Sequence, residues 1–167
     1  MGFNAGHVVQ DEALAMRAAQ AIRLAGLYAA PPVMRIALAL PFLRSGLTRW
    51  DPFPTLSPGT QFLFEDQFKL HLFGRLVDLP SPTLLAYATA CAEIVLPLLL
   101  LLGLATRLAA LGLLAMTAVI QLVVPEGWAN FHLYWAALAL GIMALGGGPL
   151  SLDAALARLF RSRRAST

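Results

Sequence analysis

One carboxylate lies inside a long apolar stretch of this sequence. Residues 83–104 contain Glu93 near their centre and no other charged side chain. A segment of this length and composition crosses the hydrocarbon core of a membrane, which places Glu93 near the bilayer midplane. An isolated carboxylate costs on the order of 3 kcal/mol there, and charged groups within membrane spans often bind a proton or a ligand. Glu93 is therefore expected to have a partner, or to be neutral.

Two arginines of an earlier apolar segment are candidate partners for Glu93. Arg44 lies slightly to the external side of the midplane and Arg35 lies further to the cytoplasmic side. Side chains lean toward the N-terminus of their helix, so Arg44 and Glu93 lean toward each other from antiparallel helices. We expect Arg44 to pair with Glu93 and Arg35 to reach the cytoplasmic headgroups. A kink at Pro41 would leave Arg35 as a second contact.

Two further polar side chains lie at about the depth of Arg44. Gln121 precedes Pro125 by about one turn, and His132 lies near the start of the last apolar segment. The sequence thus predicts a polar pocket in the outer half of the bundle, made of Arg44, Glu93, Gln121 and His132. Three aromatic residues surround it, as in the belts that mark membrane interfaces: Trp128, Tyr134 and Trp135.

Each of these residues also has a purely structural interpretation. Glu93 and Arg44 could form an ion pair that fixes helix register without binding anything. His132 is more readily an interfacial histidine than a haem or metal ligand, because a second axial histidine in a span is missing. His71 lies in the long loop and reaches His132 only if that loop folds down. No catalytic motif is found, so we predict no catalytic residue, no haem and no metal.

The composition identifies the class of protein that holds these residues. Of 167 residues, 59% are hydrophobic and 13% are charged, and the mean hydropathy is +0.72. The single cysteine, Cys91, excludes an internal disulfide. The net charge of +3 does not indicate nucleic acid. These values predict an all-α integral membrane protein, an antiparallel four-transmembrane-helix bundle with interfacial amphipathic helices at both ends.

Three segments are expected along the chain. Residues 1–30 are predicted to form an amphipathic cytoplasmic or interfacial segment, and residues 151–167 a short amphipathic helix and a basic tail, with Ser151 as N-cap. Residues 31–150 form the membrane domain. Its spans are expected at about 32–48, 83–104, 108–124 and 130–145, and its external loop at 50–82. Within that loop, residues 61–77 fit a helix and a strand equally well, so both remain open.

Basic residues predict the orientation. Seven arginines lie on the side of both termini and of the turn at Arg107, against Arg49, Lys69 and Arg75 on the other side. Because cytoplasmic loops carry the excess of Lys and Arg, both termini are expected in the cytoplasm.

Several strings resemble the DoxX family, small four-span proteins of bacterial inner membranes. They are "MRIALALPFLRSGLTRW", "CAEIVLPLLLLLGLATR" and the "GGGPLSLD" that ends the fourth span, and the resemblance covers about residues 31–155. Arg35, Arg44, Glu93 and Arg107 occupy positions of the family motif. The resemblance implies no demonstrated chemistry for them. The family resemblance implies a subunit linked to quinol oxidation or thiosulfate:quinone oxidoreduction, or an accessory protein of oxidative- or metal-stress systems.

Two functions follow as expectations. The first is an inner-membrane subunit of a redox system that binds a quinone or similar apolar ligand, with Arg44 donating to a ligand oxygen, Glu93 exchanging protons, and His132 and Gln121 orienting the ligand. Because no electron carrier is visible, a membrane or periplasmic partner protein would be needed. The second is a non-catalytic anchor or scaffold of a stress-response complex. Transport is disfavoured, because the cytoplasmic half offers only Arg35 and Thr117 as polar groups.

Overall fold

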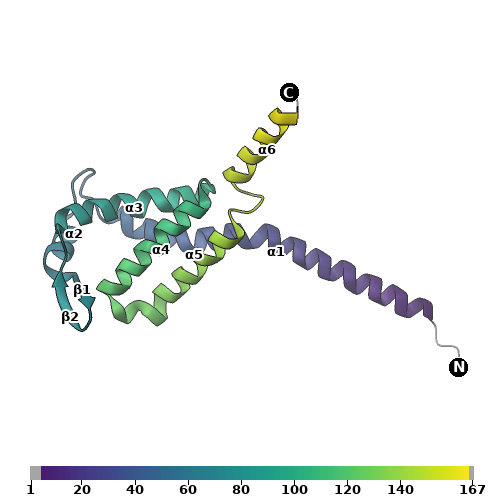
Figure 1. Cartoon of the computed structure of the whole chain (residues 1–167), viewed down its shortest axis with the longest axis horizontal. Helices are drawn as coiled ribbons and strands as arrows, with labels where there is room; N and C mark the ends of the chain where they lie inside the picture. Colours follow the sequence, from purple (N-terminus) through teal and green to yellow (C-terminus); the bar gives the residue numbers. More distant parts are fainter. Residues whose placement is uncertain (1–4, 166–167) are drawn as a thin grey trace.

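Four long helices form the body of the protein. The computed structural model describes residues 5–165, and its principal helices are α1 (Ala5–Leu47), α3 (Pro82–Leu102), α4 (Thr106–Val123) and α5 (Leu133–Leu145) (Figure 1). Each contains or extends into a segment long and apolar enough to cross a membrane. Four spans are thus confirmed. They pack in the cyclic order α1, α3, α4, α5 and back to α1.

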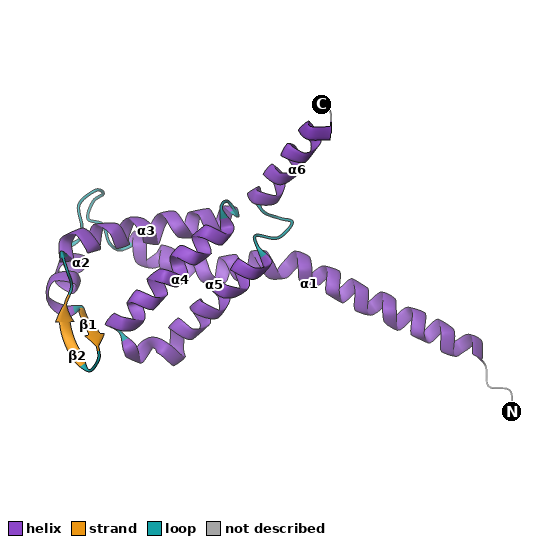
Figure 2. Cartoon of the chain, in the orientation of Figure 1, coloured by secondary structure: helices purple, strands orange, loops and turns teal. Residues whose placement is uncertain are grey.

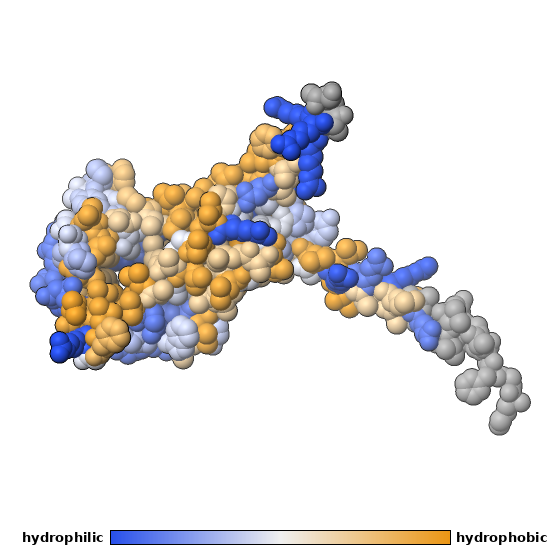
Figure 3. Space-filling model, in the orientation of Figure 1, coloured by the Kyte–Doolittle hydropathy of each residue, from blue (hydrophilic) through white to orange (hydrophobic). Residues whose placement is uncertain are grey.

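A core of aliphatic and small side chains lies between these helices. Leu38 of α1, Leu100 of α3, Leu113 of α4 and Ile142 of α5 are almost completely buried in it. Buried alanines such as Ala110 let the helices approach closely, as small residues do in membrane bundles. Hydrophobic residues cover much of the face of the bundle that Figure 3 shows, as expected of a surface that contacts lipid tails.

The first helix differs from the prediction. From residue 5 onward, the predicted interfacial segment is not a separate helix, because α1 continues without interruption from Ala5 to Leu47. Pro31, Pro32 and Pro41 lie inside it. A proline removes one backbone hydrogen bond, but a membrane helix tolerates that loss, so these residues do not end the helix. The N-terminal half of α1 extends from the bundle as a single helix (Figure 1).

The loop between α1 and α3, which the sequence predicts to be external, contains both a helix and a hairpin. A short helix α2 (Pro58–Phe62) continues into a π-helical turn (Leu63–Gln67). Strands β1 (Lys69–Leu72) and β2 (Arg75–Asp78) then pair as an antiparallel hairpin, with Lys69 opposite Asp78 (Figure 2). A second cluster of buried side chains lies beneath this loop and against α3: Leu56, Phe64, Leu79, Ala86 and Ala90.

Turns at both ends join the spans. Gly103 ends α3 in the left-handed conformation (φ 68°), with its N–H donated to Leu100 and that of Leu104 to Leu99. A 3₁₀ turn (Pro125–Gly127) and a π-helical turn (Trp128–His132) lead from α4 into α5. The last helix, α6 (Leu152–Ala165), begins where Ser151 accepts the N–H of Ala154. This confirms the predicted N-cap.

Candidate functional site

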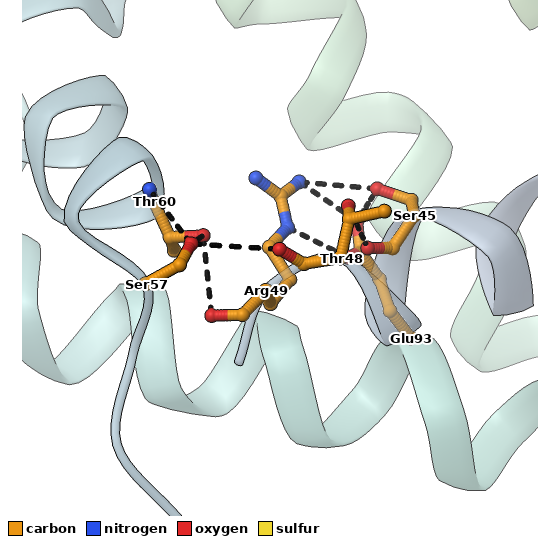
Figure 4. Close-up of polar contacts among 6 residues, drawn as sticks. All are labelled: Ser45, Thr48, Arg49, Ser57, Thr60 and Glu93. Carbon is orange, nitrogen blue, oxygen red and sulfur yellow. Dashed lines mark hydrogen bonds and ion pairs between the residues drawn. The ribbon is translucent and has the colours of Figure 1, made fainter. Parts of the chain in front are cut away.

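Glu93 forms a buried ion pair with Arg49. Its Oε2 accepts from Arg49 Nε at 2.9 Å, and its Oε1 accepts from Arg49 Nη2 at 3.1 Å and from Ser45 Oγ at 3.1 Å (Figure 4). The side chains of Arg49 and Glu93 are 13% and 3% exposed. Two parallel bonds between a guanidinium and a carboxylate are strong and directional. Both oxygens of this carboxylate therefore have defined partners.

The local sequence of α1 explains how these three residues meet. Ser45 and Arg49 are four residues apart, so they lie on the same side of the chain as α1 ends. Gly46 lies between them against α3, where a Cβ atom would stand 2.9 Å from the backbone of Glu93. The absence of a side chain at Gly46 lets the two helices approach closely enough for Arg49 and Ser45 to reach the carboxylate.

The predicted pairing of Glu93 with Arg44 is wrong. Arg44 is exposed on the outer face of α1 and has no hydrogen bond or ion pair with any described residue. The depth argument ended the first span at residue 48 and counted Arg49 as an external charge. A side chain that leans back along its helix can return into the bundle from beyond the span. The spacing of Ser45 and Arg49 was the signal that could have indicated this.

A cavity of about 250 Å³ lies beside the ion pair. Its walls are mainly apolar, with Phe42 of α1, Leu85 of α3, Ile120 of α4 and Trp135 of α5 among them. Arg49, Ser45 and Glu93 form its polar part. Arg49 Nη1 donates to no partner within residues 5–165, so its two N–H groups remain available (Figure 4).

The loop between α1 and α3 covers this cavity. Phe64, Phe68 and Leu79, which flank the hairpin, line it, and the ring of Phe64 lies 5.5 Å from the guanidinium carbon of Arg49. His71 of β1 fixes the hairpin to the bundle through Nδ1, which lies 3.1 Å from the carbonyl oxygen of Leu122. The loop thus joins the pocket, whereas His71 contacts α4 and not His132.

His132 and Gln121 form a second pair outside the cavity. His132 Nδ1 lies 2.6 Å from Gln121 Oε1, and Gln121 Nε2 donates to the carbonyl of Pro125. The buried imidazole packs against Trp135 and against Gly127, which leaves no room for a Cβ. Neither residue lines the cavity, so the predicted four-residue pocket is wrong: Glu93 pairs with Arg49, His132 pairs with Gln121, and Arg44 joins neither pair.

The remaining predicted residues occupy different surroundings. Trp135 lines the cavity and packs on Phe42, with ring centroids 4.9 Å apart. Trp128 and Tyr134 are exposed at the outer surface, as expected of interfacial aromatic residues. In the part of the chain that the structure describes, no three His, Cys, Asp or Glu side chains lie close enough together to hold a metal ion.

Arg35 lies at the opposite end of the bundle and is buried, which corrects the prediction that it reaches the headgroups. It is 3% exposed and donates from Nη2 to the carbonyl of Leu150 at 2.9 Å. Its Nη1 would collide with any side chain at Gly103. Arg35 therefore ties α1 to the start of the C-terminal segment.

Asp153 holds the neighbouring end of α4. Ala105 at the N-cap of α4 has no side chain that could cap the helix, and Asp153 accepts instead from the N–H groups of Ala105 and Thr106 and from the Thr106 hydroxyl, at 2.7–2.9 Å. Burial raises the pKa of Asp153, but the bonds from Thr106 and Ala105 and the charge of Arg35 outweigh burial and leave it below the ordinary value.

One comparison with known proteins identifies a relationship. The model of the DoxX family matches residues 30–126, which is more than half of the chain. The matched region includes Arg49, Glu93, the β1–β2 hairpin and α4. Neither a curated protein nor a solved structure matches the sequence.

Proposed function

Since the chain belongs to the DoxX family and is a multi-pass membrane protein, we propose that it binds a quinone, or a similar small apolar ligand with a carbonyl oxygen, in the cavity beside Arg49. In this proposal it is the membrane subunit of a redox system. The observation that carries the proposal is an apolar cavity with a free guanidinium nitrogen, Arg49 Nη1, at its polar part. Binding sites for small molecules typically combine apolar walls with a few placed polar groups.

The charge of the site favours a neutral oxygen. Glu93 offsets the positive charge of Arg49 at 2.9 Å, so an anionic ligand would meet little net attraction and would lose its hydration on entry. A carbonyl oxygen needs only a hydrogen-bond donor, which Arg49 Nη1 provides. A quinone ring meets this requirement and also suits the aromatic and aliphatic walls.

The structure changes the roles that the sequence suggested. Arg49, instead of Arg44, donates to the ligand oxygen. Glu93 orients Arg49. It is also the carboxyl group that lines the cavity among the described residues, so in this proposal it exchanges protons with the ligand. His132 and Gln121 act only through the fold, since they hold the turn that positions Trp135.

The proposal includes a partner protein and a location. Electron transfer needs a carrier that this chain would obtain from a membrane or periplasmic partner. The excess of arginines in α6 and in the N-terminal half of α1 supports cytoplasmic termini in a bacterial cell, with the hairpin on the outer side of the inner membrane. Figure 1 shows α6 and that half of α1 at the end of the bundle opposite the hairpin.

Binding of a short-chain ubiquinone to the detergent-purified protein tests this proposal. Leu85 lines the cavity, whereas the neighbouring Leu84 is 69% exposed on the lipid-facing side of α3. We expect Leu85→Trp to abolish binding and Leu84→Trp to preserve it. Arg49→Lys keeps the charge but loses the planar donor set, so it should weaken binding about tenfold. A folded wild-type protein that does not bind, or equal binding by the two tryptophan variants, contradicts the proposal.

A second candidate function is a scaffold for a stress-response complex. The N-terminal half of α1 favours it, because Leu14, Ile22 and Leu27 are about half exposed or more on a helix that leaves the bundle. A partner that copurifies with the full chain, is lost when residues 5–24 are deleted and is retained by Leu85→Trp would support this function over ligand binding.

A further inference from the structure

A groove lies between α1 and α6 at the end of the bundle opposite the hairpin. Tyr28 forms its α1 side, and Pro149, Leu150 and four residues of α6 form the rest of its walls. The segment before α6 is fixed here, because Arg35 binds the carbonyl of Leu150 and Gly148 packs against Pro31. The groove therefore has a defined position at the level where the spans end.

Two arginines line this groove. Arg158 donates from Nε to the carbonyl of Ala154 and from Nη2 to that of Pro149, at 3.2 and 2.9 Å, so its guanidinium is held in place across the groove. Arg161 lies one turn further along α6 and makes no hydrogen bond or ion pair within the described chain. Two adjacent guanidinium groups, one held and one free, form a donor set that suits a phosphate.

No acid competes for these arginines inside the groove. Its described lining contains no carboxylate. Asp153, the acidic residue of α6, is occupied by the N-terminus of α4. Hydrophilic atoms gather on the outer end of α6 in Figure 3, with hydrophobic atoms on the rest of the helix. The groove therefore has a positive charge that nothing described in its walls balances.

An apolar cavity adjoins the groove. Leu27, Ala30, Pro31 and Leu145 line it, and Tyr28 and Pro149 belong to both walls. A ligand in the groove can thus extend an apolar chain past Tyr28 and along the end of α5. An amphiphile with a phosphate head fits both compartments, whereas a free phosphate would use only one of them.

We propose that this groove binds the headgroup of an anionic phospholipid, with Arg158 and Arg161 contacting the phosphate and an acyl chain lying against Leu27 and Leu145. The exposed apolar face of α6, with Leu156, Leu159 and Phe160, then rests on the same leaflet. Basic residues next to apolar surface are the usual features that recognise acidic lipid at a membrane surface.

Native mass spectrometry of the full-length protein tests this site. Detergent-purified protein is titrated with a diacyl phosphatidylglycerol, with phosphatidylcholine of the same chains as the neutral lipid. Arg158→Ala/Arg161→Ala removes both groove arginines, and Arg163→Ala/Arg164→Ala removes the same charge from the same helix outside the groove. Arg161→Ala alone preserves the bonds of Arg158, so it separates lost binding from a disturbed fold.

We expect one tightly bound phosphatidylglycerol per wild-type chain and markedly weaker phosphatidylcholine binding. The groove double variant should lose about tenfold or more in affinity, Arg161→Ala should lose several-fold, and the control double variant should change less than about threefold. Equal losses in the two double variants would show a general charge effect and overturn the site. Displacement of the lipid by equimolar inorganic phosphate would identify a free-anion site and overturn it as well.

Discussion

At the scale of single residues, the buried Arg49–Glu93 pair makes each of its two members hard to replace alone. Removing both groups from water is costly, and the pair is tolerated because every oxygen of the carboxylate has a partner at 2.9–3.1 Å. The pair is stable only when both members are present, because the loss of one leaves a buried charge without its counter-charge. The two arginines near the end of α1 should therefore respond very differently to truncation.

Arg49→Ala is expected to lower the free energy of unfolding by about 3–5 kcal/mol, because it leaves the Glu93 carboxylate buried and unpaired. Arg44→Ala, on the exposed face of the same helix, should change it by no more than about 0.5 kcal/mol. Denaturant unfolding in a mild detergent, followed by tryptophan fluorescence, measures both. Restoration of stability by Arg49→Met/Glu93→Leu would confirm that the unpaired charge is the cause, and equal effects of Arg49→Ala and Arg44→Ala would disprove the assignment.

Asp153 gives a pH dependence with a defined sign. Its pKa in the folded protein lies below the ordinary value, so its stabilisation is fully present above the unfolded pKa of about 3.9 and is lost as the pH falls through the folded value. Asp153→Ala should cost about 1–2 kcal/mol at pH 7, as the loss of a helix cap does. Melting temperatures from pH 3 to pH 7 should show wild type and variant converging at the acidic end.

Asp66→Ala is the matched control for this titration, since Asp66 is exposed and has no partner in the described chain. Asp66→Ala should have about the melting temperature of the wild type at pH 7, and therefore a higher one than Asp153→Ala. A gap between wild type and Asp153→Ala that stays constant down to pH 3 would show that the cap acts without its charge.

At the scale of secondary-structure elements, the contact between α1 and α3 is set by Gly46. A methyl group there would overlap the backbone of Glu93. A side chain could relieve such an overlap by changing its rotamer, but a helix backbone cannot. The same contact brings Ser45 and Arg49 to the carboxylate. The packing of two helices and the geometry of the site therefore depend on one position.

Gly46→Ala should destabilise the protein by about 1–3 kcal/mol, because α1 and α3 must separate. Gly26→Ala serves as the control on the same helix, since nothing lies within 4 Å of its added Cβ, and it should stabilise α1 by up to about 1 kcal/mol. Thermal unfolding of the two variants beside wild type decides the point. A neutral Gly46→Ala with unchanged quinone binding would mean that the helices are not in close contact there.

The sequence predicted the elements better than their boundaries. Apolar length alone identifies four spans, and side-chain chemistry identifies Ser151 as an N-cap, because both signals are local. The predicted boundary between a separate segment up to residue 30 and a span beginning after it is wrong. Proline weakens a helix, but it does not end one by itself, and α1 continues through Pro31. The segment 61–77 fitted two patterns since it contains both, a helical turn up to Gln67 and a hairpin from Lys69.

The candidate site was predicted only in part, for a related reason. Glu93 stands out in any hydropathy profile, and its need for a partner follows from the cost of burying a charge. The identity of that partner depends on how far α1 continues and on which way an arginine beyond its end points. The pairing of Gln121 with His132, away from the cavity, depends on the π-helical turn at residues 128–132, which no local pattern indicates.

At the scale of the whole molecule, the even number of spans places the hairpin and α6 at opposite ends. Cysteine labelling in a Cys91→Ser background tests the proposed orientation. Phe73 is fully exposed at the tip of the hairpin, and Ser162 lies on α6. A membrane-impermeant maleimide should label Phe73→Cys in spheroplasts and Ser162→Cys only after the membrane is opened. The reverse pattern would invert the topology.

The close approach at Gly46 also has an evolutionary meaning. A side chain at this position is destabilising as long as α3 packs this closely, and a mutation at Arg49 leaves the Glu93 carboxylate without its ion-pair partner. Lineages that lose one of the three residues are thus expected to lose or exchange the others soon after. Among homologues, residues 46, 49 and 93 should therefore covary, whereas residue 44 should vary independently of them.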